Sequence, residues 1–466
     1  MKAKYQFNTL VMIYVIVIAI AILTWIIPGG EYKRTITDGR TQIASDSFAY
    51  VKSNPQGPGE ILIAPMKGFI QAGQIIIFIF IIGGAFKVIE KTGAITLAVQ
   101  KTAFTFAKRP ELQKYFIPIT ITIFSLGGAI FGMCEETIPF VLIFIPISLS
   151  LGYDSLVGTA IPFLGAAAGF AGAIFNPFTV GIAQKISGLP PGSGLGYRVV
   201  IWFISTASII IFLMRYSARI KKNPEKSIVY EIDKNRKNAL GLNSGETISI
   251  AGNIRIILVL FPVAIAVLIL GILKYKWDFF EMAAVFFAFG IIAGKFGKLS
   301  FSQIADDFKE GAKDMVGVAL IISSARAILI IATDGRILDL LFHGLAGAIS
   351  GMHPVFAAQS MFLAHGVINF FVHSGSAQAA LTMPIMSPLA DIVGITRQTA
   401  VLAFQFGDGW INPILPTSGV TMAVLGLAGI SWEKWFKWLF KLQIYFVIIA
   451  LALLVPPVLI FFYGPH

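Results

Sequence analysis

The stretches 169–179, GFAGAIFNPFT, and 407–419, GDGWINPILPTSG, decide the fold, because an Asn-Pro pair interrupts a long apolar segment in each. The two pairs, Asn176-Pro177 and Asn412-Pro413, lie 236 residues apart. Proline lacks the backbone donor that continues a helix. Irregular backbone at membrane depth is tolerated only where protein buries it or where it lines a cavity. The two stretches therefore predict paired broken helices that meet at a binding site between two repeated halves.

Further landmarks support the repeat. Three pairs are each separated by 242 residues, namely Gly93 and Gly335, Pro146 and Pro388, and Gly152 and Gly394. The charges of the loops indicate that the first copy enters the membrane from outside and the second from inside. Such an inverted repeat is typical of secondary transporters.

The composition indicates a polytopic membrane protein. Of the 466 residues, 56% are hydrophobic and only 13% are charged, whereas soluble domains carry about 25% charged residues. The formal net charge of +12 comes mainly from basic residues in loops beside apolar segments. This pattern follows the positive-inside rule and argues against a nucleic-acid partner.

Several kinds of chemistry are excluded by the motifs. Cys134 is the only cysteine, so the chain has no internal disulfide and no cysteine-based metal site. It has no P-loop and no HExxH or GxSxG motif, so we expect neither an ATP-driven pump nor an enzyme. We expect no cofactor other than Na⁺ or H⁺ as a coupling ion.

The expected fold is an all-α polytopic membrane protein with about ten transmembrane helices plus two re-entrant hairpins in an inverted repeat. The apolar runs 115–131 and 138–150 are shorter than the roughly 20 residues of a spanning helix, so they predict the first hairpin. Trp432 and Trp435 are expected at a bilayer surface. The expected parts are a first transmembrane helix with an extracytoplasmic loop in 1–68, a first repeat in 69–217 with hairpin 115–150 and broken helix 155–190, a basic cytoplasmic linker in 218–250, a scaffold helix pair in 251–313, and a second repeat in 314–466 with hairpin 356–392 and broken helix 397–426.

Two adjacent carboxylates lie at the tip of the first hairpin. Glu135 and Glu136 precede Thr137 in an apolar region, and charges inside a membrane are costly and usually functional. Crowded carboxylates resist joint ionisation, so one of them is expected to titrate or to bind a cation or an amino group. The alternative is that this tip reaches the far interface, where water solvates both.

The tip of the second hairpin carries neutral polar side chains. Ser374, Ser376 and Gln378 offer donors and acceptors suited to an amino acid or a carboxylate. Helix capping by the two serines is the alternative. His373 is a candidate proton carrier, and a structural hydrogen-bonding role is its alternative.

The two breaks carry oxygen ligands. Asn176 and Thr179 lie in the first break, and the second contains Asp408, Asn412, Thr417 and Ser418. Amide, hydroxyl and carbonyl oxygens are the ligands that hard cations prefer, so we expect ion coupling here, with Na⁺ at Asn176 and Asn412. The alternative is a proline kink patched by serine and threonine.

Arg326 lies in the middle of a predicted span, in LIISSARAILIIAT. An intramembrane arginine needs a partner, which is either an acidic side chain or a substrate carboxylate gripped by two hydrogen bonds. Both remain open.

Three segments carry a resemblance to a known family: GFAGAIFNPFTVGIAQKISGLP at 169–190, SGSAQAALTMPIMSPLADIVGITRQTAVLAFQFGDGW at 374–410, and PTSGVTMAVLGLAGISWEKW at 416–435. They resemble the YfcC-like branch of the C4-dicarboxylate anaerobic carrier (DcuC-type) family, within the ion transporter superfamily. The resemblance covers nearly the whole chain. It implies a homodimer in the bacterial cytoplasmic membrane, in which a transport domain moves like an elevator against a scaffold domain.

The resemblance also implies where the sites are. By position it places substrate and sodium at Glu135, Glu136, Thr137, Asn176, Thr179, Ser374, Ser376, Asp408, Asn412, Thr417 and Ser418. The chain departs from the family at residues 134–137, where Cys-Glu-Glu-Thr replaces the Ser-Asn-Thr type signature of the symporter relatives. The acidic pair suits a ligand with an amino group, and members of the branch are often labelled arginine/ornithine exchangers or basic amino-acid antiporters.

The sequence therefore predicts a secondary active transporter, a symporter or exchanger, for an amino acid such as arginine or ornithine. One alternative is a sodium- or proton-coupled transporter of C4-dicarboxylates or other short carboxylates. An ion channel is an alternative of another class, and it would show a continuous hydrophilic pore.

Overall fold

The computed structural model describes residues 9–37, 40–44, 47–239, 254–275, 277–460 and 463–464. The N-terminal segment 1–8, which we predict to be cytoplasmic, and residues 240–250 of the predicted linker lie outside the described residues.

The described part of the chain contains eleven helical segments that are long and apolar enough to cross a membrane. This confirms the predicted class of an all-α polytopic membrane protein. The segments are α1 (Thr9–Ile26), α3 (Gly73–Lys91), α5 (Pro110–Phe131), α7 (Ser155–Gly172), α9 (Leu195–Lys222), α11 (Ile254–Tyr275), α12 (Phe279–Phe296), α14 (Val316–Asp334), α16 (Pro354–Phe371), the interrupted pair α18 (Arg397–Gly409) and α19 (Gly419–Ala428), and the final pair α20 (Trp432–Leu453) and α21 (Pro456–Leu459).

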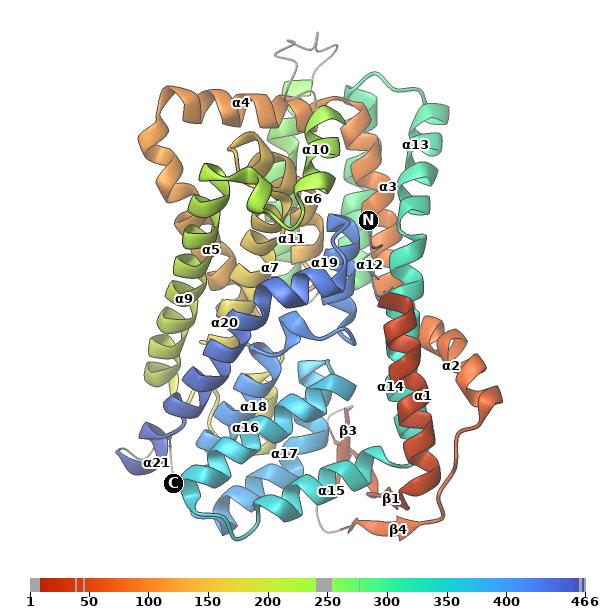
Figure 1. Cartoon of the computed structure of the whole chain (residues 1–466), viewed down its shortest axis with the longest axis vertical. Coiled ribbons are helices and arrows are strands. Elements are labelled where there is room, and N and C mark those ends of the chain that lie inside the picture. Colours follow the sequence, from red (N-terminus) through yellow and green to blue (C-terminus); the bar gives the residue numbers. More distant parts are fainter. Residues whose placement is uncertain are drawn as a thin grey trace.

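Further helices complete the two halves. They are α2 (Pro58–Gln71), α4 (Ala94–Lys108), α6 (Thr137–Ser150), α8 (Val180–Ile186), α10 (Tyr230–Ala239), α13 (Phe301–Asp314), α15 (Leu338–Ile349) and α17 (Gly375–Ile392), with 3-10 turns η2 (Pro224–Lys226) and η3 (Asn412–Ile414). The elements α3–α9 and α14–α20 follow the same order. In Figure 1, α4 lies at the top and its counterpart α15 at the bottom. Opposite placement is what an inverted repeat requires, and the inverted repeat stays a prediction.

The region between the first two spans is more structured than the sequence predicts. Instead of a plain loop it contains two antiparallel pairs, β1 (Gly29–Glu31) with β4 (Ala49–Val51) and β2 (Arg34–Thr37) with β3 (Arg40–Ile43). Gly30 lies opposite Tyr50, and Arg34 opposite Ile43. Helix α2 follows and packs against α14. The apolar pattern predicts a second span at about 69–90, but this helix begins later, at Gly73, because α2 ends just before it.

The first arm of the first hairpin is longer than predicted. It was expected at 115–131, but α5 begins at Pro110 and has 22 residues, a length sufficient to span. Proline fits the first turn of a helix because its missing donor has no partner there, and Glu111 in that turn complements the helix dipole. The polar residues at 110–114 are thus part of the helix.

The helices pack in two groups. In one group α5 and α6 pack on α7, α16 on α18, and α17 on α8; in the other α12 and α13 pack on α3, and α1 and α2 on α14. The first group contains both hairpins and both broken helices. This packing brings the predicted site residues to the middle of the fold.

Candidate functional site

The first break is a true interruption of the helix. Helix α7 ends at Gly172, Ala173 takes a left-handed φ of 43°, and α8 begins only at Val180. The buried Arg198 of α9 donates from Nε to the carbonyl oxygen of Ala173 at 3.1 Å. A side chain from a neighbouring helix thus satisfies a carbonyl that the break frees.

The second break is satisfied in the same way by two tryptophans. Trp435 donates from Nε1 to the carbonyl of Pro413 at 2.8 Å, and Trp432 donates to the carbonyl of Ile414 at 3.0 Å. Trp435 is fully buried within the protein, and its position at a bilayer surface stays a prediction. The freed carbonyls of η3 need donors, and an indole N–H on the packed α20 supplies one.

The tip of the first hairpin rests on the first break. Gly132 has a φ of 72°, and a Cβ there would lie only 2.6 Å from Asn176 Oδ1. Within the tip, the Cys134 N–H donates to Glu136 Oε2 at 2.9 Å, and Thr137 Oγ1 donates to the Cys134 carbonyl at 2.6 Å. The carboxylate of Glu136, one of the predicted site residues, therefore stabilises the turn at its own hairpin tip.

The tip of the second hairpin touches both breaks. A Cβ on Gly375 would lie 2.5 Å from Asp408 Oδ2 and 2.5 Å from Thr179 Cγ2. Ser374 is the N-cap residue of α17, but its side chain makes no capping bond; it lies 3.3 Å from Ser376 Oγ instead. The side chain of Ser374 therefore does not cap α17, so the capping alternative is wrong for this serine.

The second break is held by amides. Asn412 Nδ2 donates to Asp408 Oδ1 at 3.3 Å, and Asn369 Nδ2 donates to the carbonyls of Gly407 and Asp408 at 3.1 Å each. Glu135 of the first tip lies within electrostatic range of Asp408. Both tips and both breaks thus meet around Asp408.

A small cavity of about 20 Å³ joins the first tip to the second break. Its lining includes Cys134, Thr137, Asn412 and Ser418. A volume of this size holds about one water molecule or one small ion. Apolar side chains form most of the remaining lining, and a ligand larger than one water molecule requires the tips to separate.

The buried polar atoms at this meeting point are the strongest chemical feature. Among the described residues the following buried atoms have no hydrogen-bond partner: Asn176 Nδ2, Thr179 Oγ1, Gln378 Oε1, Asp408 Oδ2, Asn412 Oδ1 and Thr417 Oγ1. An unsatisfied buried polar atom costs about 1–3 kcal/mol. Most native structures contain few of them, and each requires an explanation such as a ligand, an ion or water.

Arg326 lies to one side of this meeting point. It comes from α14, its Nη1 is 3.5 Å from His373 Nε2, and its buried Nε has no partner among the described residues. No carboxylate of the described residues lies within ion-pair distance of it. The structure therefore links Arg326 to the second hairpin tip and not to an acidic partner.

Four polar residues near the site were missed by sequence reasoning. Asn369, His365 and Gln405 are fully buried, and Arg198 is nearly so. Gln378 Nε2 donates to the carbonyl of His365 at 2.9 Å, so these residues belong to the same region. The available signal was a polar side chain inside an apolar segment, as in FLAHGVINFF at 362–371.

Comparisons with known proteins agree with a carrier. The profile of the family described as "C4-dicarboxylate anaerobic carrier" (DcuC) matches residues 8–458. YfcC of Escherichia coli (strain K12), whose name assigns it provisionally as a basic amino acid antiporter, is 35% identical over 470 residues, covering 92% of each chain. An uncharacterised protein of Haemophilus influenzae (strain ATCC 51907 / DSM 11121 / KW20 / Rd) is 28% identical over 502 residues, covering 97% of this chain and 98% of that protein.

Two solved structures are also similar in outline. The YdaH transporter of Alcanivorax borkumensis is 12% identical, with a TM-score of 0.43, covering 98% of this chain and 100% of that chain. MtrF of Neisseria gonorrhoeae, described with a class of antimetabolite efflux pumps, is 16% identical, with a TM-score of 0.42, covering 98% of this chain and 96% of that chain. By the family match over nearly all of its length, the chain is an integral membrane protein that belongs to the C4-dicarboxylate anaerobic carrier (DcuC) family of membrane transporters.

Proposed function

We propose that this protein is a secondary active transporter that moves an amino acid across the bacterial cytoplasmic membrane, as an exchanger or a symporter. The observation that carries the proposal is the set of buried, unpartnered polar atoms where both hairpin tips and both helix breaks meet. These atoms come from three separate segments, the first break, the second hairpin tip and the second break, so a bound ligand would satisfy them and hold the segments together.

The chemistry of the unpartnered atoms suits a ligand with both signs of charge. Asn176 Nδ2 is a donor and can bind a carboxylate, whereas Asp408 Oδ2 and Thr179 Oγ1 can accept from an ammonium group or coordinate a cation. Asn412 Oδ1 and Thr417 Oγ1 add two neutral oxygens. We propose that Na⁺ or H⁺ occupies the Asp408 side and that the substrate spans the rest.

Among the amino acids, one with a basic side chain fits this site best. Glu135 lies near Asp408 and beside Glu136, which places several carboxylates at one side of the site. The name of the related YfcC protein also refers to a basic amino acid. Arginine and ornithine are therefore the substrates to test first.

A short dicarboxylate is the second candidate. Arg326 is a half-buried cation whose buried Nε has no partner among the described residues, and an arginine can grip a carboxylate with two parallel hydrogen bonds. The family description refers to C4-dicarboxylates. In this case Arg326 and the Asn-Pro breaks would form the primary site.

The division of the packing into two groups supports an elevator mechanism. The hairpins and broken helices pack mainly on one another, and α1–α3 pack with α12–α14. We propose that the first group carries substrate and moves against the second, which would also form a homodimer interface.

A thermal-shift screen of the purified full chain in detergent tests this proposal. A ligand that binds the folded state raises the apparent stability, by about 2.7 kcal/mol at a concentration of 100 times Kd. We expect stabilisation by arginine or ornithine and an effect of Na⁺ or of pH. Stabilisation only by a dicarboxylate and only with Na⁺, relative to choline, would replace the amino acid with the second candidate.

A further inference from the structure

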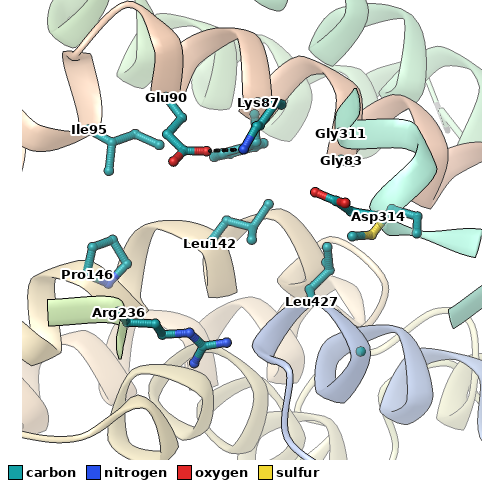
Figure 2. A pocket seen from close by; sticks show the side chains of 13 residues that line it. Gly83, Lys87, Glu90, Ile95, Leu142, Pro146, Arg236, Gly311, Asp314 and Leu427 are labelled. Carbon is teal, nitrogen blue, oxygen red and sulfur yellow. Dashed lines mark ion pairs between the residues drawn. The ribbon is translucent and has the colours of Figure 1, made fainter. Parts of the chain in front are cut away.

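A cavity that offers charged groups lies away from the site described above. Its volume is about 400 Å³, within the range of about 300–1,000 Å³ typical of small-molecule sites. Figure 2 shows it between α3 and α13 above and α6, α10 and α19 below. It therefore lies between the two packing groups, at the end of the molecule that carries α4 and α10 (Figure 1).

The wall formed by α3 and α13 has an excess of carboxylates. Lys87 Nζ lies 3.4 Å from Glu90 and 3.3 Å from Glu310, so two glutamates already balance this one cation. Asp314 is exposed at the end of α13 and forms no ion pair with any described residue. Glu90 and Asp314 both line the cavity, and this wall therefore attracts cations.

The opposite wall carries a single cation, Arg236 of α10. Its Nη2 donates to the carbonyl of Ala428 at the end of α19, and its Nη1 lies 3.7 Å from Asp233 Oδ1. That Nη1 is buried and makes no hydrogen bond to a described residue. In Figure 2 the Arg236 side chain runs along the lower wall of the cavity, on the opposite side from α3.

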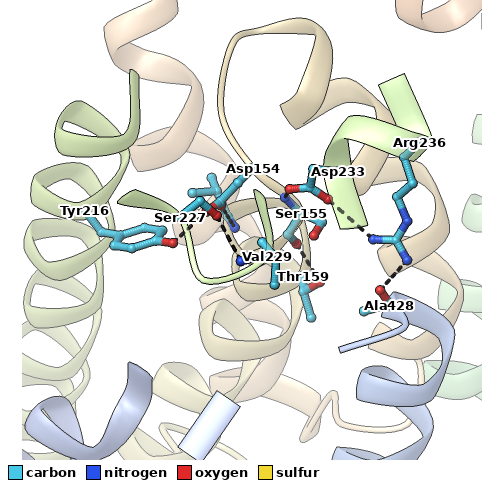
Figure 3. Close-up of polar contacts among 10 residues, drawn as sticks. Asp154, Ser155, Thr159, Tyr216, Ser227, Val229, Asp233, Arg236 and Ala428 are labelled. Atoms are coloured by element: carbon cyan, nitrogen blue, oxygen red, sulfur yellow. Dashed lines mark hydrogen bonds and ion pairs between the residues drawn. The ribbon is translucent and has the colours of Figure 1, made fainter. Parts of the chain in front are cut away.

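A network of polar contacts fixes α10 to the N-terminal end of α7, which belongs to the first packing group (Figure 3). Asp154 caps α7 by accepting from the Val157 N–H at 3.0 Å, and it also accepts from Tyr216 Oη at 2.5 Å and Ser227 Oγ at 2.8 Å. Asp233 Oδ2 accepts from the Ser155 N–H at 2.8 Å. Burial raises the pKa of both Asp154 and Asp233. These contacts hold Arg236 against α7 and α19, on the opposite side of the cavity from α3 and α13.

We infer that this cavity is a second substrate site, which binds a basic amino acid with its α-carboxylate on Arg236 and its cationic groups on Glu90 and Asp314. The inference rests on the proposed function and extends it to a site of entry or release. The cavity is separate from the buried site, because Leu427 in its lining lies nine residues beyond Ser418, or about 13 Å along α19 at about 1.5 Å per residue. A ligand with one carboxylate and two cationic groups matches the charges of the two walls.

Equilibrium dialysis with radiolabelled L-arginine tests the inference on the purified full chain. The background variant is Asn412→Ala, which disables the buried site. We expect arginine to remain bound, and we expect Arg236→Gln or Asp314→Asn in this background to weaken binding at least 10-fold. Asp306→Asn is the matched control, since it makes the same change on α13 at a residue that does not line the cavity, and it should leave binding unchanged.

A second ligand identifies which group each wall binds. Agmatine lacks the α-carboxylate of arginine, so its binding should depend on Asp314 and not on Arg236. Equal effects of Arg236→Gln on both ligands, or no effect of Asp314→Asn on either, would overturn the assignment of the walls.

Uptake by proteoliposomes separates the two proposals. If the wild-type protein transports arginine but Asn412→Ala binds none, the cavity proposal fails and the proposed function stands. If the wild-type protein binds no arginine and transports none, both proposals fail. Because Asp314 is exposed and unpaired among the described residues, Asp314→Asn should fold even if Arg236→Gln does not.

Discussion

Asn412 donates from Nδ2 to Asp408 Oδ1 at 3.3 Å, and both Asp408 Oδ2 and Asn412 Oδ1 are buried without a partner in the described part of the chain. The two residues are four positions apart across the end of α18, so both side chains lie on the same side of the break. They therefore present a carboxylate oxygen and an amide oxygen side by side, which is a suitable pair of ligands for a cation or an ammonium group.

Replacing Asn412 should remove transport without unfolding the protein. Its amide forms one long hydrogen bond, so Asn412→Ala should lower the free energy of unfolding by only about 1 kcal/mol, while uptake into proteoliposomes falls at least 100-fold. Asn223→Ala, at an exposed asparagine in the linker, is the matched control. Uptake close to that of the wild type in Asn412→Ala would remove Asn412 from the site.

Asp408 should determine the response to the coupling ion. Asp408→Asn keeps the size of the side chain but removes its charge, and a neutral amide attracts Na⁺ or H⁺ less strongly. In a thermal-shift measurement the wild type should be stabilised by Na⁺ relative to choline, or by a change of pH, and the variant should lose this response. An unchanged ion response in Asp408→Asn would place the coupling ion elsewhere.

Gly375 tests the close contact between the second hairpin tip and the breaks. In Gly375→Ala the new Cβ would lie 2.5 Å from both Asp408 Oδ2 and Thr179 Cγ2, so the tip must shift and uptake should fall at least 10-fold. Gly347→Ala is the control, because a Cβ there meets nothing within 4 Å and the residue lies in α15. The control should keep its activity and gain up to about 1 kcal/mol of stability.

Arg326 should contribute to carboxylate binding through the shape of its guanidinium. Arg326→Lys keeps the positive charge but loses the two parallel donors, so KM should rise at least 10-fold with a smaller change in kcat. His373→Gln removes the neighbouring ring and tests whether the effect depends on their 3.5 Å contact. A KM for Arg326→Lys equal to that of the wild type would limit Arg326 to a structural role.

The stability of the α7 cap should depend on pH through Asp154. Burial raises the pKa of Asp154 above its ordinary value of about 3.9. The folded carboxyl keeps its proton over a pH range in which the unfolded chain releases it. Its contribution to stability is therefore full below pH about 3.9 and is lost as the pH rises through the raised pKa. Relative to Asp154→Asn, the unfolding free energy of the wild type should decrease from pH 4 upward, and a difference that increases with pH would contradict this.

Much of the fold could be predicted because the bilayer imposes a simple rule on the sequence. Spanning segments must be long and apolar, so hydropathy alone predicts spans at about 8–27, 254–273, 279–297 and 314–333. These match α1, α11, α12 and α14 to within a few residues. Helix α2, with 14 residues, and the strands after α1, with three or four residues each, were missed because such short segments carry no such signal. The longer α5 was missed because its first turn is polar.

The sequence by itself determined the membrane class, the family and the residues to suspect, since a polar or Asn-Pro interruption inside an apolar span is costly and therefore conspicuous. Only the tertiary structure decided which of these residues meet. Gly375 lies between Thr179 and Asp408, although it is nearly 200 residues from Thr179 in the sequence. Trp435 is buried and donates to the carbonyl of Pro413. Partners of this kind are selected by packing between distant segments, where a freed backbone group takes whichever donor the fold brings near.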